Sequence, residues 1–327
     1  MNKILSLVIL LFSLPLMVVA GDAVPGGEQG YRIGDYRRGG ASSPKYEYRA
    51  VWLTTIENLD WPKTVVRMPS DTIRQQRELC AILDSLKALN VNTVLLQTRV
   101  RGDVIYPSRL ESFSHVLTGV EGRSPGYDPL AFAISECHKR GIAVILDMVF
   151  NHSTGLNPMN KLYPYGDDLK YNPWFNVTAP HPDNVYEDWN HDFAPAKKMM
   201  IRALNYWLTE YKVDGFRMDL SHGLCGTTYD AMDHITDYYE KGVKAVAEDA
   251  YFILEHWGPQ MSSERPKLIN QGMLCWDNTT NAYYQTAMGW LKDGDSFTNA
   301  NRDGYVTYCE SHDEERAFFK AKQYGNG

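Results

Sequence analysis

Residues 213–222, an apolar run that ends in charged side chains, restrict most strongly how this chain can fold. Strands of a parallel sheet are packed on both faces and are therefore apolar. Charge at their C-terminal ends is tolerated where those ends open into a solvated or substrate-filled cleft. Arg217 and Asp219 are two residues apart, so on a strand their side chains share one face. We expect the guanidinium to keep Asp219 ionised at neutral pH, as an aspartate nucleophile requires; the alternative is a structural salt bridge.

Three further apolar runs end in acidic or imidazole side chains. They are residues 142–152, with Asp147, Asn151 and His152; residues 251–257, with Glu255; and residues 305–316, with His312 and Asp313. The C-terminal ends of parallel barrel strands meet at one face, so the four runs predict one site at that face.

In this order and spacing, the four runs resemble the four signature regions of the alpha-amylase family, glycoside hydrolase family 13. By this resemblance Asp219 matches the nucleophile, Glu255 the general acid/base and Asp313 the aspartate that stabilises the transition state. The positions that support the nucleophile or bind substrate in the family are matched by Asp147, His152, Arg217, His222 and His312. For His222 alone, the alternative is a surface histidine without a role.

The chemistry of an acetal fits this assignment. Its cleavage needs a proton for the leaving oxygen and negative charge beneath the developing oxocarbenium ion, so two carboxyl groups must be held in opposite protonation states. The apolar neighbours of Glu255 in residues 251–257 are expected to raise its pKa towards the acid role. The resemblance implies a retaining mechanism with a covalent glycosyl intermediate on Asp219.

The first part of the chain alternates strands and helices. Residues 49–55 and 91–97 are predicted strands. Residues 70–89 form a predicted helix that Ser70 and Asp71 cap, and a second helix from Pro129 to Cys137 ends before Gly141. This order predicts an α/β fold with a parallel sheet, and the fold class is a TIM (β/α)8-type barrel.

Residues 49–141 resemble a different family, the bacterial glycosyl-hydrolase-like 10 barrel proteins. The resemblance rests on residues 49–52, 58–62, 97–108 and 125–130. The chain therefore reads as a composite of two barrel families, with the junction near residues 138–143.

The second half continues the alternation. Predicted helices are 195–211, with an apolar face of Met199, Ala203, Tyr206 and Trp207, then 230–247 and 280–291; predicted strands are 267–275 and 304–310. No eighth strand and no C-terminal β-sandwich follow, so we expect a barrel truncated after its seventh strand.

The barrel domain is expected to span residues 46–327, and the residues before it predict export. Residues 1–20 have the features of a signal peptide cut after Ala20, and residues 21–45 those of a flexible linker, which predicts a secreted or periplasmic protein without a membrane anchor after cleavage. The five cysteines are odd in number and lack CxxC spacing, so we expect small buried hydrophobes.

The net charge and the aromatic content restrict the classes of molecule that the protein can be expected to bind. A net charge of -7 argues against nucleic acid, because no basic stripe is available to release counterions. The 8 Trp and 21 Tyr suit a polysaccharide or oligosaccharide substrate, although most such residues pack in cores.

An irregular stretch, 153–194, follows His152 and matches the small inserted domain of alpha-amylases. Its aromatic residues either form a platform for sugar rings or pack against one another. By the same resemblance Asn151 is a candidate calcium ligand, and Asp192 of the insert could add a second oxygen.

We therefore expect a secreted glycosidase that cleaves α-glucosidic bonds of starch or maltodextrin. The alternatives are a non-catalytic carbohydrate-binding envelope protein and a glycosidase of the second family acting on another polysaccharide. The last alternative is the weaker of the two, because the resemblance to the glycosyl-hydrolase-like 10 family ends before the third strand.

Overall fold

The computed structural model describes residues 48–100, 102–162, 169–183, 185–290 and 303–326. The chain forms two compact units. The first takes its described residues from 48–144 and 277–326, and the second is Ile145–Trp276. The strands β6 (Ala143–Met148) and β11 (Leu274–Asn278) each pass from one unit into the other. The expected signal peptide and linker lie outside the described residues.

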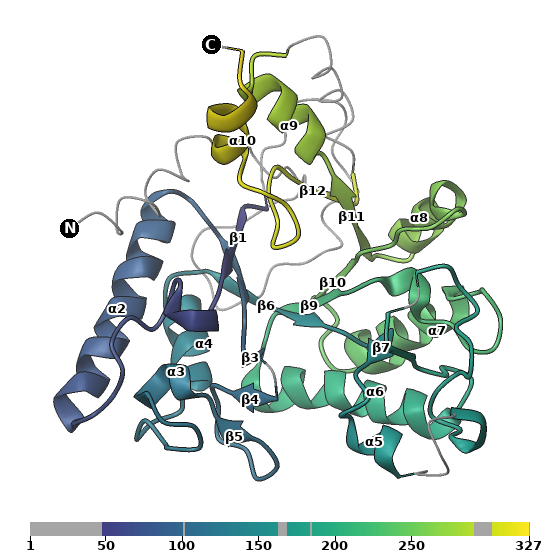
Figure 1. The fold of residues 1–327 in the computed structure, drawn as a ribbon, viewed down its shortest axis with the longest axis horizontal. Helices are drawn as coiled ribbons and strands as arrows, with labels where there is room; N and C mark the ends of the chain where they lie inside the picture. Colours follow the sequence, from purple (N-terminus) through teal and green to yellow (C-terminus); the bar gives the residue numbers. More distant parts are fainter. Residues whose placement is uncertain (1–47, 101, 163–168, 184, 291–302, 327) are drawn as a thin grey trace. The chain divides into compact units, whose positions relative to one another are not determined.

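Seven strands form one sheet in the order in which they occur along the chain (Figure 1). The other five are β1 (Ala50–Leu53), β2 (Thr93–Leu96), β9 (Gly215–Met218), β10 (Tyr251–Leu254) and β12 (Tyr305–Tyr308). The pairs β1–β2, β6–β9, β9–β10 and β10–β11 are parallel. A sheet that adds each new strand beside the previous one is the arrangement of a (β/α) barrel, so the predicted fold class is confirmed. Within the described residues no eighth strand follows β12.

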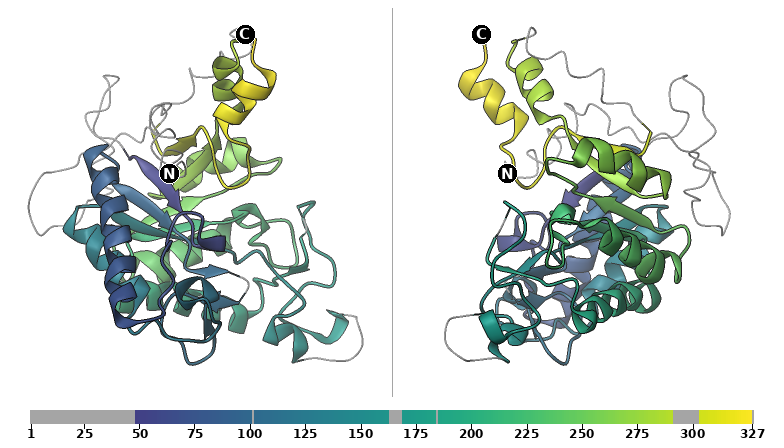
Figure 2. Two further views of the ribbon diagram at one scale, coloured as in Figure 1. Left: turned by 60° about the vertical axis from the view of Figure 1, so that its left-hand side comes forward. Right: turned by 90° about the vertical axis from the view of Figure 1, so that its right-hand side faces the viewer.

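Helices connect the successive strands, as parallel pairing requires. They are α2 (Pro69–Ala88), α4 (Pro129–Lys139), α6 (Ala194–Tyr206) with the π-helical turn η4 (Trp207–Tyr211), α7 (Met232–Asp237) with the π-helical turn η6 (Tyr238–Lys244), α8 (Met261–Asn270), α9 (Thr280–Ala287) and, after β12, α10 (Ala317–Tyr324). In the first unit α9 and α10 lie side by side in Figures 1 and 2.

The predicted cap of α2 is wrong by two residues. The helix begins at Pro69, whose fixed φ suits the first helical position, and Met68 is the N-cap residue. Asp71 instead occupies the third helical position and accepts the backbone N–H groups of Arg67 (3.0 Å) and Met68 (3.1 Å). These hydrogen bonds lower the pKa of Asp71.

Short elements complete the first unit. They are the 3-10 turn η2 (Ile56–Asn58), the three-stranded sheet of β3 (Arg99–Val100), β4 (Asp103–Val104) and β5 (Ser112–Phe113), and α3 (His115–Thr118).

The insert of the second unit contains little regular structure. It has α5 (Pro158–Lys161), the 3-10 turn η3 (Leu169–Tyr171) and an antiparallel pair, β7 (His152–Ser153) with β8 (Glu187–Asp188). Its aromatic rings pack against one another: Phe175 on Trp189 at 4.4 Å and Trp174 on Phe193 at 5.2 Å between centroids. Of the two expectations for these aromatics, the structure supports mutual packing for this group.

The predicted apolar face of α6 is wrong. The buried residues are Ala196, Met200, Leu204 and, in η4, Leu208. They recur every four residues, and a Cβ on Gly242 of η6 would come within 2.8 Å of Leu204. The close approach of η6 therefore decides which stripe is buried, and Tyr206 remains 48% exposed.

The predicted strand 267–275 is also wrong in its first half. Residues up to Asn270 belong to α8, and β11 begins only at Leu274. Pro266 inside α8 and the polar run before it hide the helix in the sequence, because proline removes a backbone donor.

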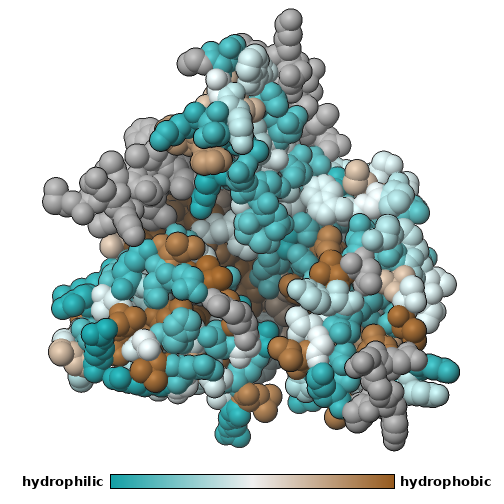
Figure 3. Space-filling view, in the orientation of Figure 1, coloured by the Kyte–Doolittle hydropathy of each residue, from teal (hydrophilic) through white to brown (hydrophobic). Residues whose placement is uncertain are grey.

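The next features are the polarity of the surface and the state of the cysteines. Hydrophilic side chains cover most of the face shown in Figure 3, and apolar ones form small separate groups on it. No helix among the described residues has the length and apolarity that crossing a membrane requires. All five cysteines are free, and Cys137, Cys225 and Cys275 are buried as expected.

Candidate active site

The site lies where β6, β9 and β10 end, all within the second unit. Asp147 on β6 is in register with Arg217 on β9, and Met218 is in register with Leu254 on β10. Backbone hydrogen bonds continue the ladders past the strands, from Asp219 N to Met148 O and from Glu255 N to Met218 O, both at 3.0 Å. The register of the paired strands therefore places Asp147, Asp219 and Glu255 at the same end of the sheet.

Arg217 is the centre of the site. Its side chain has no exposed surface, and one nitrogen (Nη1) contacts both Asp147 oxygens, at 2.9 and 3.1 Å, and Asp219 Oδ1, at 2.8 Å. The other nitrogen (Nη2) forms an ion pair with Glu255 Oε1 at 2.7 Å. A single guanidinium thus bridges Asp219 and Glu255, so the two carboxyl groups face one space.

The chain turn after β9 brings a second donor to Glu255. Leu220 adopts a left-handed conformation with φ 37° and ψ 53°. Its backbone N–H donates to Glu255 Oε2 at 3.0 Å, and the N–H of Ser221 donates to the Glu255 carbonyl at 2.8 Å. The strained turn therefore ties the loop after Asp219 to Glu255. Sequence reasoning placed Glu255 in apolar surroundings; its side chain is buried, but the Arg217 guanidinium forms an ion pair with one of its oxygens and the N–H of Leu220 donates to the other.

The electrostatics of Asp219 differ from the expectation. The pKa of Asp219 is raised to about 6. Burial is the largest cause and raises the pKa, Arg217 lowers it, and the charges of Glu255 and Asp147 raise it. One cation serves three carboxylates, so burial and like charge outweigh it. At pH 7 the group is still mostly ionised, as a nucleophile must be, but with a margin of only about one pH unit.

The structure brings four predicted residues together: Asp147, Arg217, Asp219 and Glu255. Asp147 was expected to bind substrate, yet its two oxygens are hydrogen-bonded to Arg217. Sequence reasoning missed Trp276, whose ring lies 5.7 Å from the Arg217 guanidinium carbon. Its position at the end of an apolar strand is a signal that could have indicated it.

His152 and His222 are not equivalent. His152 is partly buried, and burial lowers the pKa of its imidazole. His222 is 3% exposed, and its Nε2 lies 2.9 Å from Glu264 Oε2. The alternative of a plain surface histidine is therefore wrong for His222, and substrate binding by either imidazole stays a prediction.

His312 and Asp313 belong to the first unit, where the His312 ring packs on Trp52 at 4.6 Å between centroids. Asp313 is 62% exposed at its side chain and lies 3.5 Å from His312 Nε2. Their predicted roles at the reacting sugar stay predictions.

The two candidate calcium ligands differ in how well they fit. Asn151 is 1% exposed, and its Oδ1 atom has no hydrogen-bond partner among the described residues, as expected of an oxygen available to a hard cation. Asp192 is half exposed, and its Oδ2 accepts the backbone N–H and hydroxyl of Thr227 at 2.7 and 2.8 Å. Asn151 therefore has an oxygen available to a cation, whereas Asp192 is engaged by Thr227, and calcium binding by either residue stays a prediction.

Comparison with known proteins decides the family. The family model described as Glycosyl hydrolase-like 10 matches residues 47–264, which is more than half of the chain. The chain belongs to the Glycosyl hydrolase-like 10 family. The match includes β9, β10 and the catalytic candidates Asp219 and Glu255, and it continues across the expected junction at residues 138–143.

Curated relatives include two proteins named glycosyl hydrolase and a cyclomaltodextrinase. Glycosyl hydrolase YngK of Bacillus subtilis (strain 168) is 26% identical over 238 residues, which is 69% of this chain and 42% of YngK. Glycosyl hydrolase DigH of Escherichia coli (strain K12) is 41% identical over 100 residues, 29% of this chain and 23% of DigH. A cyclomaltodextrinase of Bacillus sp is 25% identical over 190 residues, 54% of this chain and 32% of that protein. The chain spans less than half the length of each.

Solved structures support the same fold. A pullulanase from Anoxybacillus sp. LM18-11 matches with a TM-score of 0.62 at 17% identity, over 94% of this chain and 51% of that one. An alpha-amylase from Anoxybacillus matches with a TM-score of 0.57 at 15% identity, over 84% and 64%. The resemblance to alpha-amylases is thus confirmed at the level of the fold. The Glycosyl hydrolase-like 10 match reaches residue 264 and so includes part of the region for which that resemblance was noted.

Proposed function

We propose that this protein is a retaining glycoside hydrolase of the alpha-amylase type, which cleaves α-glucosidic bonds in starch-like glucans. The observation that carries the proposal is the bridge from Arg217 to both Asp219 and Glu255. Retaining glycosidases need two carboxyl groups close together, one charged and one protonated. Three carboxyl groups around one guanidinium favour such a state, because full ionisation would leave two unbalanced negative charges in a buried site.

The reaction uses the two carboxyl groups in turn. Glu255 donates its proton to the glycosidic oxygen while an Asp219 oxygen attacks the anomeric carbon, so the bond to the leaving group breaks and a glycosyl ester forms. Glu255, now a base, takes a proton from water, which displaces Asp219 from the anomeric carbon. Arg217 holds both side chains in place and supports the ionised form of Asp219.

The test is release of reducing ends from soluble starch and from maltodextrins. Asp219→Asn and Glu255→Gln are expected to lose activity by about 10³-fold or more, because each removes a group that bonds to the reacting atoms. Asp233→Asn makes the same change at an exposed position of α7 and serves as the control. A wild-type chain as inert as Asp219→Asn, but still able to bind glucan, would favour the non-catalytic carbohydrate-binding alternative.

A second candidate is a glycosidase that acts on another polysaccharide. The family model supports it, because its match extends through residue 264 instead of ending before the third strand. The reason for ranking this reading lowest is thereby removed. A panel of β-linked polysaccharides beside starch separates the two: turnover of a β-linked substrate, lost in Asp219→Asn, would replace starch as the substrate class.

Calcium binding at Asn151 is a further part of the proposal. Its support is the buried, unpaired Oδ1 of Asn151. We expect calcium added to chelator-stripped protein to raise the melting temperature of wild type but not of Asn151→Ala. An unchanged wild-type melting temperature would dispose of calcium.

The last part of the proposal is that the protein is exported from the cytoplasm. This part rests on the charged start and apolar run of residues 1–20. Expression of the full chain in a bacterium should place a product that begins at Gly21 outside the cytoplasm, as fractionation and N-terminal sequencing would show. A product that keeps Met1 in the cytoplasmic fraction would contradict it.

A further inference from the structure

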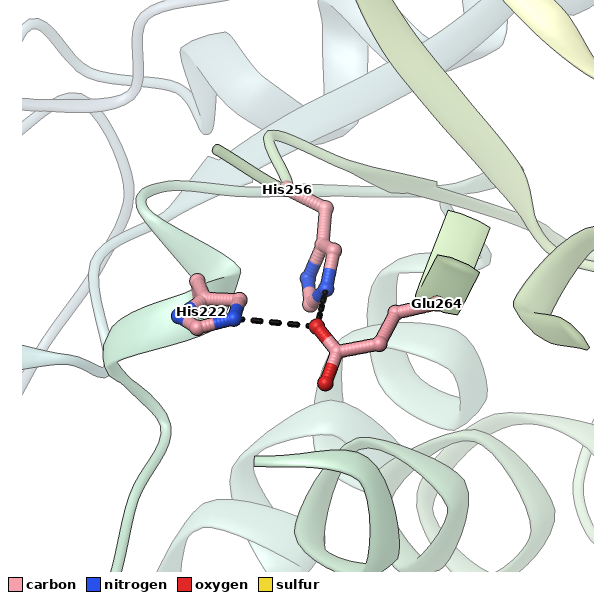
Figure 4. Close-up of side chains that lie close together, drawn as sticks. All are labelled: His222, His256 and Glu264. Carbon is pink, nitrogen blue, oxygen red and sulfur yellow. Dashed lines mark hydrogen bonds and ion pairs between the residues drawn. The ribbon is translucent and has the colours of Figure 1, made fainter. Parts of the chain in front are cut away.

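We propose that His222, His256 and Glu264 form a binding site for a zinc-type divalent cation beside the candidate active site. Two imidazoles and one carboxylate converge on one point, although the three residues come from separate segments of the second unit (Figure 4). Their potential ligand atoms all lie within 4.8 Å of one another. The inference uses none of the residues assigned to bond making, so it does not depend on the substrate.

The distances suit a shared ligand. Glu264 Oε2 lies 2.9 Å from His222 Nε2 and 3.0 Å from His256 Nε2. Ligands of a tetrahedral zinc ion lie about 2.0 to 2.1 Å from the metal when they are imidazole nitrogens or carboxylate oxygens. Donor atoms that now touch one another therefore need to separate by only a fraction of an ångström to admit an ion. Glu264 lies in the first turn of α8 and is 15% exposed, so its side chain is the one free to adjust.

The proton of His256 has a defined acceptor when a metal binds. In the metal-free arrangement each Nε2–H can donate to Glu264. Metal binding uses the Nε2 lone pair, so each imidazole must carry its proton on Nδ1. His256 Nδ1 lies 3.1 Å from Ser221 Oγ, which can accept that proton in a hydrogen bond. Such a partner behind a ligating histidine fixes its tautomer and orientation.

The chemistry of the donors selects the class of ion. Imidazole nitrogen with one carboxylate suits zinc and its first-row neighbours, whereas calcium and magnesium prefer oxygen alone. Two histidines with one glutamate are also a known ligand set for zinc with one open position. The two histidines are 3% and 0% exposed, and the ring of Tyr229 covers His222 at 4.6 Å between centroids. A site this dry and preformed favours a soft, firmly bound cation over surface adsorption.

The position of the cluster gives the ion a role. His256 directly follows Glu255, and His222 lies three residues after Asp219. A metal would clamp the turn η5 (Ser221–Gly223) and the end of β10 to α8. The metal would thereby stabilise the hydrogen bond from Leu220 N to Glu255 Oε2. All three ligands are therefore positioning residues for the catalytic carboxyl groups.

The experiment measures metal binding directly. The chain is stripped with a chelator and dialysed, then titrated with Zn²⁺ in equilibrium dialysis with metal analysis, and with Co²⁺ as a spectroscopic probe. We expect one zinc per chain, an intense visible Co²⁺ spectrum of four-coordinate type, and a higher melting temperature with zinc. His256→Gln and Glu264→Gln should weaken zinc binding at least about 100-fold. Ser221→Ala, which removes only the partner behind His256, should weaken it about 10- to 100-fold.

Controls keep the proposal open to failure. His115→Gln removes an exposed histidine that also lies near a carboxylate, Asp103 at 3.8 Å, and should bind zinc as wild type does. If His256→Gln fails to fold by circular dichroism, Glu264→Gln decides, because its shape is unchanged. The proposal is overturned if wild type binds zinc no more tightly than Glu264→Gln, or if the cobalt spectrum is that of the free ion; the cluster is then a hydrogen-bonded trio only.

Discussion

At the scale of single residues, the charge of Asp219 works against the fold. Burial raises its pKa above the unfolded value near 3.8, so the folded chain holds the proton more tightly than the unfolded chain. The free energy of unfolding therefore falls as pH rises from about 4 to about 6, and the penalty is complete at pH 7. The ionised Asp219 therefore destabilises the folded chain, and the reason for its presence is its role in the reaction.

This predicts a stabilising but inactive variant. Asp219→Asn should raise the free energy of unfolding at pH 7 by on the order of 1 to 3 kcal/mol, because the amide needs no charge in a buried site. Urea unfolding at pH 7 and at pH 4 measures it, and the gain should shrink at pH 4, where Asp219 is protonated in the folded wild type and about half protonated in the unfolded chain. A variant less stable than wild type at pH 7 would show that the contact with Arg217 outweighs burial.

The same group predicts the acid side of the pH profile. The nucleophile must be ionised, so kcat/KM should fall about tenfold per pH unit below pH 6. An acidic limit near pH 4, the value of an ordinary aspartate, would mean that Asp219 is better solvated or better paired than its surroundings indicate. Initial rates on maltodextrin from pH 4 to pH 8 decide between the two, with stability checked at each pH.

Sequence reasoning recovered the residues that neighbour one another along a strand and missed those joined across strands. Arg217 and Asp219 follow from spacing alone. The contact of Arg217 with Asp147 joins positions 70 residues apart and depends on the register of β6 and β9. Glu264 lies on a helix that the sequence pattern did not reveal, so its meeting with His222 and His256 could not be foreseen.

At the scale of elements, α6 shows how a helix can be predicted with the wrong face. Both possible stripes contain large apolar residues, and aromatic side chains drew the prediction to Tyr206 and Trp207. The structure buries the stripe that contains Leu204 because Gly242 allows η6 to approach closely there. Local sequence fixes that a helix forms, whereas the partner surface selects its buried stripe.

A matched pair of substitutions tests this assignment. Leu204→Ala should lower the free energy of unfolding by about 2 to 4 kcal/mol, because it leaves a cavity in a fully buried contact. Tyr206→Ala, at a position 48% exposed, should cost less than about 1 kcal/mol. Denaturant melts of both variants give the comparison; a larger loss for Tyr206→Ala would restore the face expected from the sequence.

At the scale of the whole molecule, two strands, β6 and β11, each contain residues of both compact units. β6 leaves the first unit after Val144 and enters the second at Ile145, and β11 makes the reverse passage after Trp276. The ladder of the second unit pairs Ile145 with Gly215, directly beside that boundary. Unfolding one unit alone would end each of these two strands between adjacent residues of the chain and leave backbone groups at that point unpaired.

We therefore expect one cooperative unfolding transition. Ellipticity in the far ultraviolet, which reports helices and strands, and tryptophan fluorescence, to which Trp52 of the first unit and Trp276 of the second contribute, should change at the same urea concentration. Leu204→Ala, whose substitution lies in the second unit alone, should shift both signals together. Two separated transitions, with only one of them moved by Leu204→Ala, would show that the strands shared by the units do not couple their stability.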